Sequence, residues 1–118
     1  MTKCHTAVVA IAARIVALYG LESVEDIFGR ARSKTVAEAR LVAHWAARHR
    51  LGWSYPELGR AFDRDHSTII QNAAEVELRI AAGQASKLML AAVAMFTESN
   101  LATAGDDATR QSAEQGAA

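Results

Sequence analysis

Two helix starts that lie close together within residues 54–72 constrain the fold of this chain more than any other feature. Ser54 can accept a hydrogen bond as the N-cap of a first helix, and Glu57 in the following turn completes a capping box. The first helix is expected to end at Phe62, which leaves room only for a tight turn before Asp65, a residue that can cap a second helix. Two short helices joined in this way form a helix-turn-helix.

The second helix begins with the polar run Asp65-His66-Ser67-Thr68, which admits three interpretations. A catalytic Asp-His-Ser relay is excluded, because consecutive residues of a helix point about 100° apart. Simple N-capping is the second interpretation. The third, which we favour, is base recognition in a major groove. Adjacent side chains at a helix start fan out toward neighbouring base pairs, and Ser and Thr can hydrogen-bond a base edge or touch a thymine methyl.

The run SYPELGRAFDRDHSTII, residues 54–70, resembles the signature of the C-terminal DNA-binding domain of DnaA, the bacterial replication initiator. The upstream run RARSKTVAEARLVAHWAAR, residues 30–48, is similar to the basic loop and long helix that precede this signature. The resemblance covers about residues 6–82. It implies an all-α fold, a small Trp-repressor-like helical bundle around the helix-turn-helix, and sequence-specific binding of double-stranded DNA at an origin-like site.

The resemblance also assigns roles to individual residues. Arg32 stands where the family's basic loop places an arginine in the minor groove, and arginine suits the strong negative potential of a narrow, AT-rich groove; the alternative is a solvated charged loop. Arg40 aligns with an arginine used in DNA contact, and Arg48 is expected to contact phosphates, whereas His44 is expected to be an ordinary surface residue. The expected DNA-binding residues are Arg30, Arg32, Lys34, Arg40, Arg48, Tyr55, Pro56, Arg64, Asp65, His66, Ser67, Thr68 and Asn72.

Two departures from the family pattern bear on affinity. The chain has Ala39-Arg40-Leu41 where the family has Pro-Arg-Gln, and Ala74-Glu75 where the family often has Arg-Lys. Fewer basic groups beside the second helix weaken contacts with the DNA backbone. The preferred DNA site is therefore expected to differ from the family's own site.

The charge distribution agrees with a DNA-reading segment. The formal net charge is zero, but residues 30–79 carry nine of the 13 Lys and Arg side chains and only six of the 13 Asp and Glu side chains. This excess is modest, so binding is expected to be modest in affinity and sensitive to salt. A chain of 118 residues, 51% of them hydrophobic, is long enough for one small core.

Apolar periodicity predicts the remaining helices and the domain organisation. Helices are expected over residues 6–19, 23–28, 35–49, 54–62, 66–82 and 84–98. Their buried stripes are expected to be Val8, Ile11, Ile15 and Leu18, then Val36, Ala39, Val42, Ala43 and Ala46, and then Ile69, Ala73, Val76 and Ile80. The expected organisation is a DNA-binding domain at 1–82, an additional helix at 83–100 and a disordered tail at 101–118.

The expected helix at 84–98 is apolar almost all round, which is typical of a helix buried on more than one side. We favour packing against the N-terminal helix, and a monomer on DNA, because the domain it resembles reads asymmetric sites as a single unit. The alternative is docking of a second copy or a host replication protein. In that alternative the chain is a protein-interaction or transcription-regulatory module.

Several classes of function are not supported by the sequence. Lone Cys4 makes neither a disulfide framework nor a metal site. Ser33-Lys34-Thr35 ends like a Walker A loop, but Phe28 and Ser33 occupy its glycine positions. No enzyme activity and no cofactor are expected, and 118 residues leave no room for the ATPase domain of DnaA. Without a membrane span or signal peptide, a cytoplasmic, nucleoid-associated protein is expected.

The biological role is left open by the sequence. A stand-alone version of such a domain suggests a phage, prophage or accessory bacterial protein. Binding of origin-like sites, competition with the host initiator and regulation of a promoter are all compatible with the residues.

Overall fold

The computed structural model describes residues 2–30 and 33–104, and the side chains within 6–30 and 33–97. Helices and their connections make up this described part, in which no strand occurs, so the all-α prediction is confirmed. The helices are α1 (Thr2–Tyr19), α2 (Glu25–Phe28), α3 (Lys34–Leu51), α4 (Tyr55–Phe62), α5 (His66–Ala81) and α6 (Lys87–Ala104).

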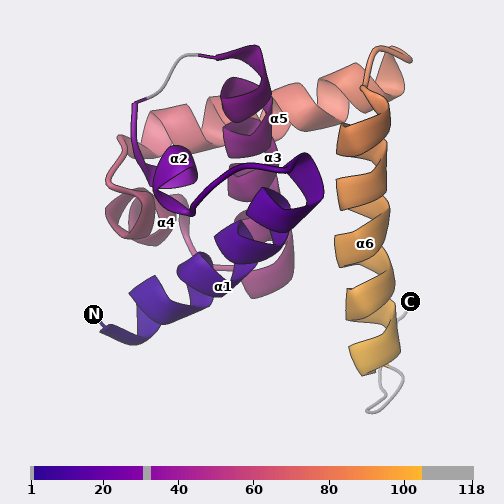
Figure 1. The fold of residues 1–118 in the computed structure, drawn as a ribbon. Coiled ribbons are helices and arrows are strands. Elements are labelled where there is room, and N and C mark those ends of the chain that lie inside the picture. The colour runs from indigo at the N-terminus through magenta and orange to yellow at the C-terminus, as the bar shows by residue number, and fades with distance from the viewer. Residues whose placement is uncertain (1, 31–32, 105–118) are drawn as a thin grey trace.

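Helix α3 is the centre of the molecule (Figure 1), and it contacts each of the five other helices. Ser33 caps its start by accepting a hydrogen bond from the Val36 amide at 3.1 Å. Its end is set by Gly52, whose φ of 68° lies in the left-handed region that glycine adopts without strain. Helix α3 is buried along most of its length, because neighbours cover it on several sides.

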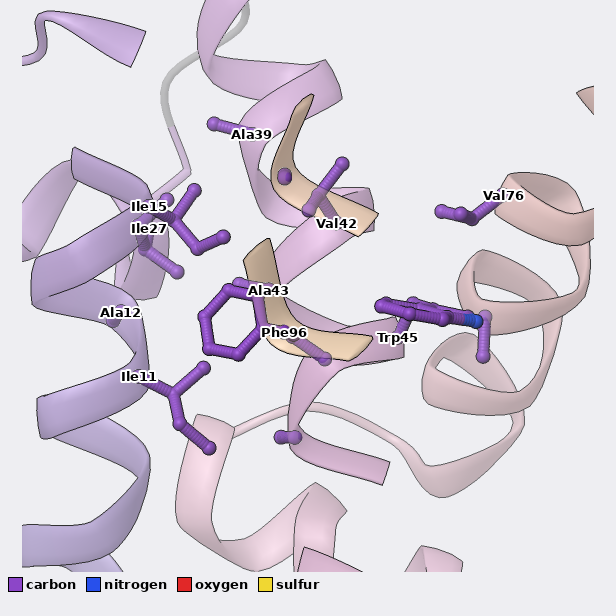
Figure 2. Packing of buried hydrophobic residues seen from close by; sticks show 14 of the residues in the cluster. Ile11, Ala12, Ile15, Ile27, Ala39, Val42, Ala43, Trp45, Val76 and Phe96 are labelled. Carbon is purple, nitrogen blue, oxygen red and sulfur yellow. The ribbon is translucent and has the colours of Figure 1, made fainter. Parts of the chain in front are cut away.

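The core combines the three buried stripes that the sequence predicts, although Leu18 and Ile80 are only partly buried. Figure 2 shows side chains from α1, α3 and α6 meeting in this core. The fully buried Phe96 of α6 lies among them. The expected packing of this last helix on the N-terminal helix is therefore confirmed, and α3 shares the contact.

The last helix begins later than the expected residue 84. The αL residue Gly83 ends α5, where the Gln84 amide bonds back to the Arg79 carbonyl at 2.8 Å. Ser86 then caps α6 by accepting from the Met89 amide at 3.0 Å, so the new helix begins at Lys87. Helix α6 runs to Ala104, which includes the start of the expected tail, and residues 105–118 lie outside the described part.

The described residues contain neither a candidate membrane span nor a candidate metal site. No helix there is both long and apolar enough to cross a membrane. In the same part of the chain, no group of three or more His, Cys, Asp and Glu side chains is arranged to hold a metal ion.

Candidate nucleic-acid interface

The helix-turn-helix is formed by α4 and α5, and its first helix starts as the sequence predicts. The Ser54 hydroxyl accepts a hydrogen bond from the Glu57 amide at 3.3 Å, and the Glu57 carboxylate accepts one from the Ser54 amide at 3.1 Å. Pro56 lies in the first turn of α4, where the missing N–H has no helical partner to lose. The capping box therefore sets the start of α4 at Tyr55.

The turn between the two helices is tight because of the backbone of Asp63 in the turn and of Gly59 in α4. Asp63 adopts the left-handed conformation, with φ 58° and ψ 49°. The Arg64 amide then bonds to the Gly59 carbonyl at 2.8 Å. Gly59 has no room for a side chain, since a Cβ atom there would lie 2.7 Å from the Arg64 carbonyl oxygen and 3.2 Å from the His66 amide nitrogen.

This close approach predicts that Gly59→Ala destabilises the fold. Alanine normally improves an ordinary helical position, but here the new methyl group meets fixed backbone atoms. We expect the free energy of unfolding to fall by roughly 1–3 kcal/mol, which is typical of overpacking. Urea denaturation of the two proteins measures the difference. An alanine variant as stable as the parent would show that the turn can move apart without loss.

The second helix begins with Asp65 as its N-cap, as the sequence predicts. The Asp65 carboxylate accepts from the Ser67 amide at 3.1 Å and also from the Ser67 hydroxyl. These two hydrogen bonds, first the hydroxyl and then the amide, hold the pKa of Asp65 below its ordinary value. Asp65 and Ser67 are thus engaged with each other, whereas no side-chain hydrogen bond engages His66 or Thr68 in the described part of the chain.

An open hollow of about 680 Å³ lies at this helix start. It brings together the beginning of α4, the turn, the beginning of α5 and Arg30, which follows α2 and its C-cap Gly29. Six of the residues expected to bind DNA line it, namely Arg30, Pro56, Arg64, Asp65, His66 and Thr68. Gly59, Arg60 and Asp63 complete the lining.

Arg60 is an exposed member of this hollow that was not among the expected DNA-binding residues. A signal for it was present, because Arg60 follows Pro56 by four residues and so lies on the same face of α4. It adds a third guanidinium to those of Arg30 and Arg64.

The other expected residues lie elsewhere. Arg48 and Tyr55 line a separate hollow of about 340 Å³, where the Arg48 guanidinium lies 4.4 Å from the centre of the Tyr55 ring and donates to the Trp53 carbonyl. Lys34 lines a third hollow of about 240 Å³. Arg32 lies outside the described residues.

The expectation that His44 is a surface residue is wrong. Its side chain is fully buried, with the ring edge against Phe62 at a centroid distance of 4.5 Å. Its Nδ1 atom lies 2.9 Å from the amide nitrogen of Asn72, so Asn72 faces α3 and joins α5 to it. Burial first, then the charges of Arg64 and Arg40, lower the pKa of His44 to about 3.

Arg40 and Arg64 are both turned toward the α2 segment. Arg40 donates to the carbonyls of Asp26 and Ile27, at 2.9 and 3.0 Å. Arg64 donates to the Phe28 carbonyl at 3.2 Å and to the Gly29 carbonyl. Part of the donor capacity of each guanidinium is therefore used within the protein.

Comparison with known proteins agrees with this architecture. A family model described as the bacterial dnaA protein helix-turn-helix matches residues 5–76. The chromosomal replication initiator protein DnaA 1 of Chlamydia pneumoniae is 40% identical over 67 residues, 57% of this chain and 15% of that protein. DnaA 2 of Chlamydia caviae is 36% identical over 70 residues, and DnaA of Dechloromonas aromatica is 38% identical over 69 residues.

The matches to the Chlamydia caviae and Dechloromonas aromatica proteins cover 59% and 57% of this chain, but only 15% of each of those proteins. The family match includes both helices of the motif up to Val76, together with α3 and nearly all of α1. On this match and on the α4–turn–α5 geometry, the chain belongs to the bacterial dnaA helix-turn-helix family and is an all-α DNA-binding domain.

Proposed function

We propose that the chain recognises specific sites in double-stranded DNA by inserting the start of α5 into the major groove. The observation that carries this proposal is the exposed helix start beside the 680 Å³ hollow. His66 and Thr68 line the hollow, and their side chains have no hydrogen-bond partner among the described residues. Donors and acceptors in this position can pair with base edges.

The arginines around the hollow support contacts with the DNA backbone. Arg30, Arg60 and Arg64 line it together with the acidic Asp63 and Asp65, so its positive excess is small. Further along α5, Glu75 forms an ion pair with Arg79 at 2.7 Å, which reduces the charge that Arg79 offers to phosphates. We therefore propose binding of modest affinity that weakens as the salt concentration rises.

The remaining expected residues extend this proposal. In it Arg48 and Lys34 contact phosphates, and Arg32 reads a flanking minor groove, as the family resemblance implies. Arg48 is half-buried, and its contact with Tyr55 leaves further guanidinium donors for a phosphate oxygen. Asn72 is the weakest member of the set, because its amide already pairs with His44.

The biological role we propose is binding of an origin-like site in replication initiation or its control. The relatives with the matching segment are chromosomal replication initiators, although the matched part is 15% of their length. We propose that the chain binds as a monomer at the nucleoid, because one helix-turn-helix with a flanking basic loop can read an asymmetric site.

This function predicts a loss of sequence preference in two variants. His66→Ala and Thr68→Ala are each expected to weaken binding to the preferred duplex by roughly 1–3 kcal/mol, since each removes a contact with a base. Binding to random duplex should change much less, because phosphate contacts remain. Selection from a random duplex library identifies the preferred site, and fluorescence anisotropy measures both affinities.

Thr97→Ala is the matched control for Thr68→Ala, because it makes the same chemical change on α6. It should leave both affinities unchanged. Equal weakening of preferred and random DNA by His66→Ala and Thr68→Ala would count against base recognition by α5.

A further inference from the structure

The short helix α2 ends with a group of carbonyls that its own backbone does not satisfy. In a helix, the last carbonyl groups have no amide partner within the helix. The Gly29 amide bonds to the Glu25 carbonyl at 2.7 Å, and no backbone amide among the described residues bonds to the carbonyls of residues 26–29. These residues lead directly into Arg30 and the basic loop, defined here as residues 30–34.

Two arginines from distant parts of the chain satisfy these four carbonyls. Arg40 of α3 takes the first two, those of Asp26 and Ile27. Arg64 of the helix-turn-helix turn takes the next two, those of Phe28 and Gly29. A guanidinium presents several donors in a rigid plane, so it can hold two neighbouring carbonyls in a fixed geometry, as an ammonium group cannot.

The arginines at this junction also repel one another. Burial and the charge of Arg30 lower the pKa of Arg40, and burial together with Arg30 and Arg40 lowers the pKa of Arg64. Three like charges are thus held close together in the unbound protein. Such a cluster is suited to a polyanion, whose charge removes the repulsion.

A second contact supports the same junction. The Phe28 ring stacks on Phe62 at the end of α4, with a centroid distance of 5.4 Å. Phe62 in turn contacts His44, which is paired with Asn72 of α5. The entry to the basic loop is therefore connected to the recognition helix through both polar and aromatic contacts.

We propose that Arg40 and Arg64 are positioning residues that hold Arg30 in a fixed place relative to the start of α5. This inference rests on the proposed DNA binding and deepens it. The two arginines determine whether a duplex can contact the start of α5 in the major groove and Arg30 beside it at the same time. They thereby act on sequence preference beside the core site, through Arg30.

The test replaces each arginine by lysine, which keeps the charge but loses the two-carbonyl contact. Arg14→Lys is the matched control, since it makes the same chemical change at an exposed arginine of α1 that has no expected role in DNA binding. Each protein is measured by fluorescence anisotropy on three duplexes that share the selected core and differ only in the flanking A·T pairs. The first duplex has A·T flanks, the second has inosine–cytosine pairs in their place, and the third has G·C pairs. Inosine–cytosine keeps the minor-groove edge of A·T, whereas G·C adds an amino group to that edge.

The parent protein is expected to bind the inosine–cytosine duplex as it binds A·T, and the G·C duplex roughly tenfold more weakly. In Arg64→Lys and Arg40→Lys this flanking preference should fall to less than twofold, while preference for the core over random DNA persists. Arg14→Lys should keep both preferences. The persisting core preference also demonstrates that each lysine variant is folded.

Two results would overturn the inference. One is a flanking preference that survives in both lysine variants. The other is an equal loss of core and flanking preference, which would assign the arginines a general stabilising role. If one lysine variant shows no cooperative thermal transition and is therefore unfolded, the result of the other variant decides. Failure of the proposed function looks different, because the parent protein itself would then show no core preference.

Discussion

Replacing Phe96 with alanine is expected to lower the free energy of unfolding by about 3–5 kcal/mol, as is usual for a large aromatic side chain in a packed core. Phe96 is fully buried, and the Arg14 guanidinium lies 5.0 Å from its ring centre. The residue belongs to α6, which lies beyond the segment that the family model matches. Chemical denaturation followed by circular dichroism measures the loss and decides whether α6 is part of the folding unit.

Leu90→Ala is the control on the same helix. Leu90 is 47% exposed, so its truncation should change stability by less than about 1 kcal/mol. A small and equal effect of both substitutions would mean that α6 does not pack on α1 and α3 in solution. In that case the alternative of a docking helix would regain support.

Acid is expected to destabilise the protein through His44. The buried imidazole stays neutral in the folded state down to a pH of about 3, the value of its lowered pKa, whereas in the unfolded chain it takes up a proton below its ordinary value of 6.5. The contribution to stability is therefore complete above pH 6.5 and is lost as the pH falls toward 3. The free energy of unfolding then falls with a slope that approaches about 1.4 kcal/mol per pH unit. The accumulated loss is about 3 kcal/mol at pH 4.

The variant His44→Gln isolates this effect, because glutamine can still pair with Asn72 but does not titrate. Urea denaturation of both proteins at pH 7.5, 5.5 and 4 gives the difference between their stabilities. This difference should change in favour of the variant as the pH falls. Parallel curves for the two proteins would show that His44 is protonated in the folded state or accessible to water.

The helix-turn-helix could be predicted in detail because its determinants are local. Ser54, Glu57 and Asp65 form caps with residues two or three positions away, and the structure contains each of these hydrogen bonds. Capping side chains and apolar periodicity act within one or two helical turns, so neither requires knowledge of the rest of the fold. The helix order and the buried stripes followed from the same short-range signals.

The contacts of Arg40 and His44 could not be predicted in this way, because they involve residues that are distant in the sequence. Both lie on the side of α3 that the sequence pattern left for solvent, but neighbouring segments cover it, so His44 is enclosed and Arg40 reaches α2. A resemblance could suggest that Arg40 contacts DNA. Only the fold reveals that its guanidinium already holds two carbonyls.

By itself, the sequence determined the order of the helices, the caps of α4 and α5 and the helix-turn-helix, since these depend on neighbours a few residues away. The tertiary structure decided which side chains share a surface. In the tertiary structure, Arg30 lines one hollow with His66 and Thr68, and Arg60 lines it too. The Asn72 amide is paired with His44 instead. The physical reason is that such contacts join residues far apart in the chain, and the packing of whole helices on α3 determines which of them meet.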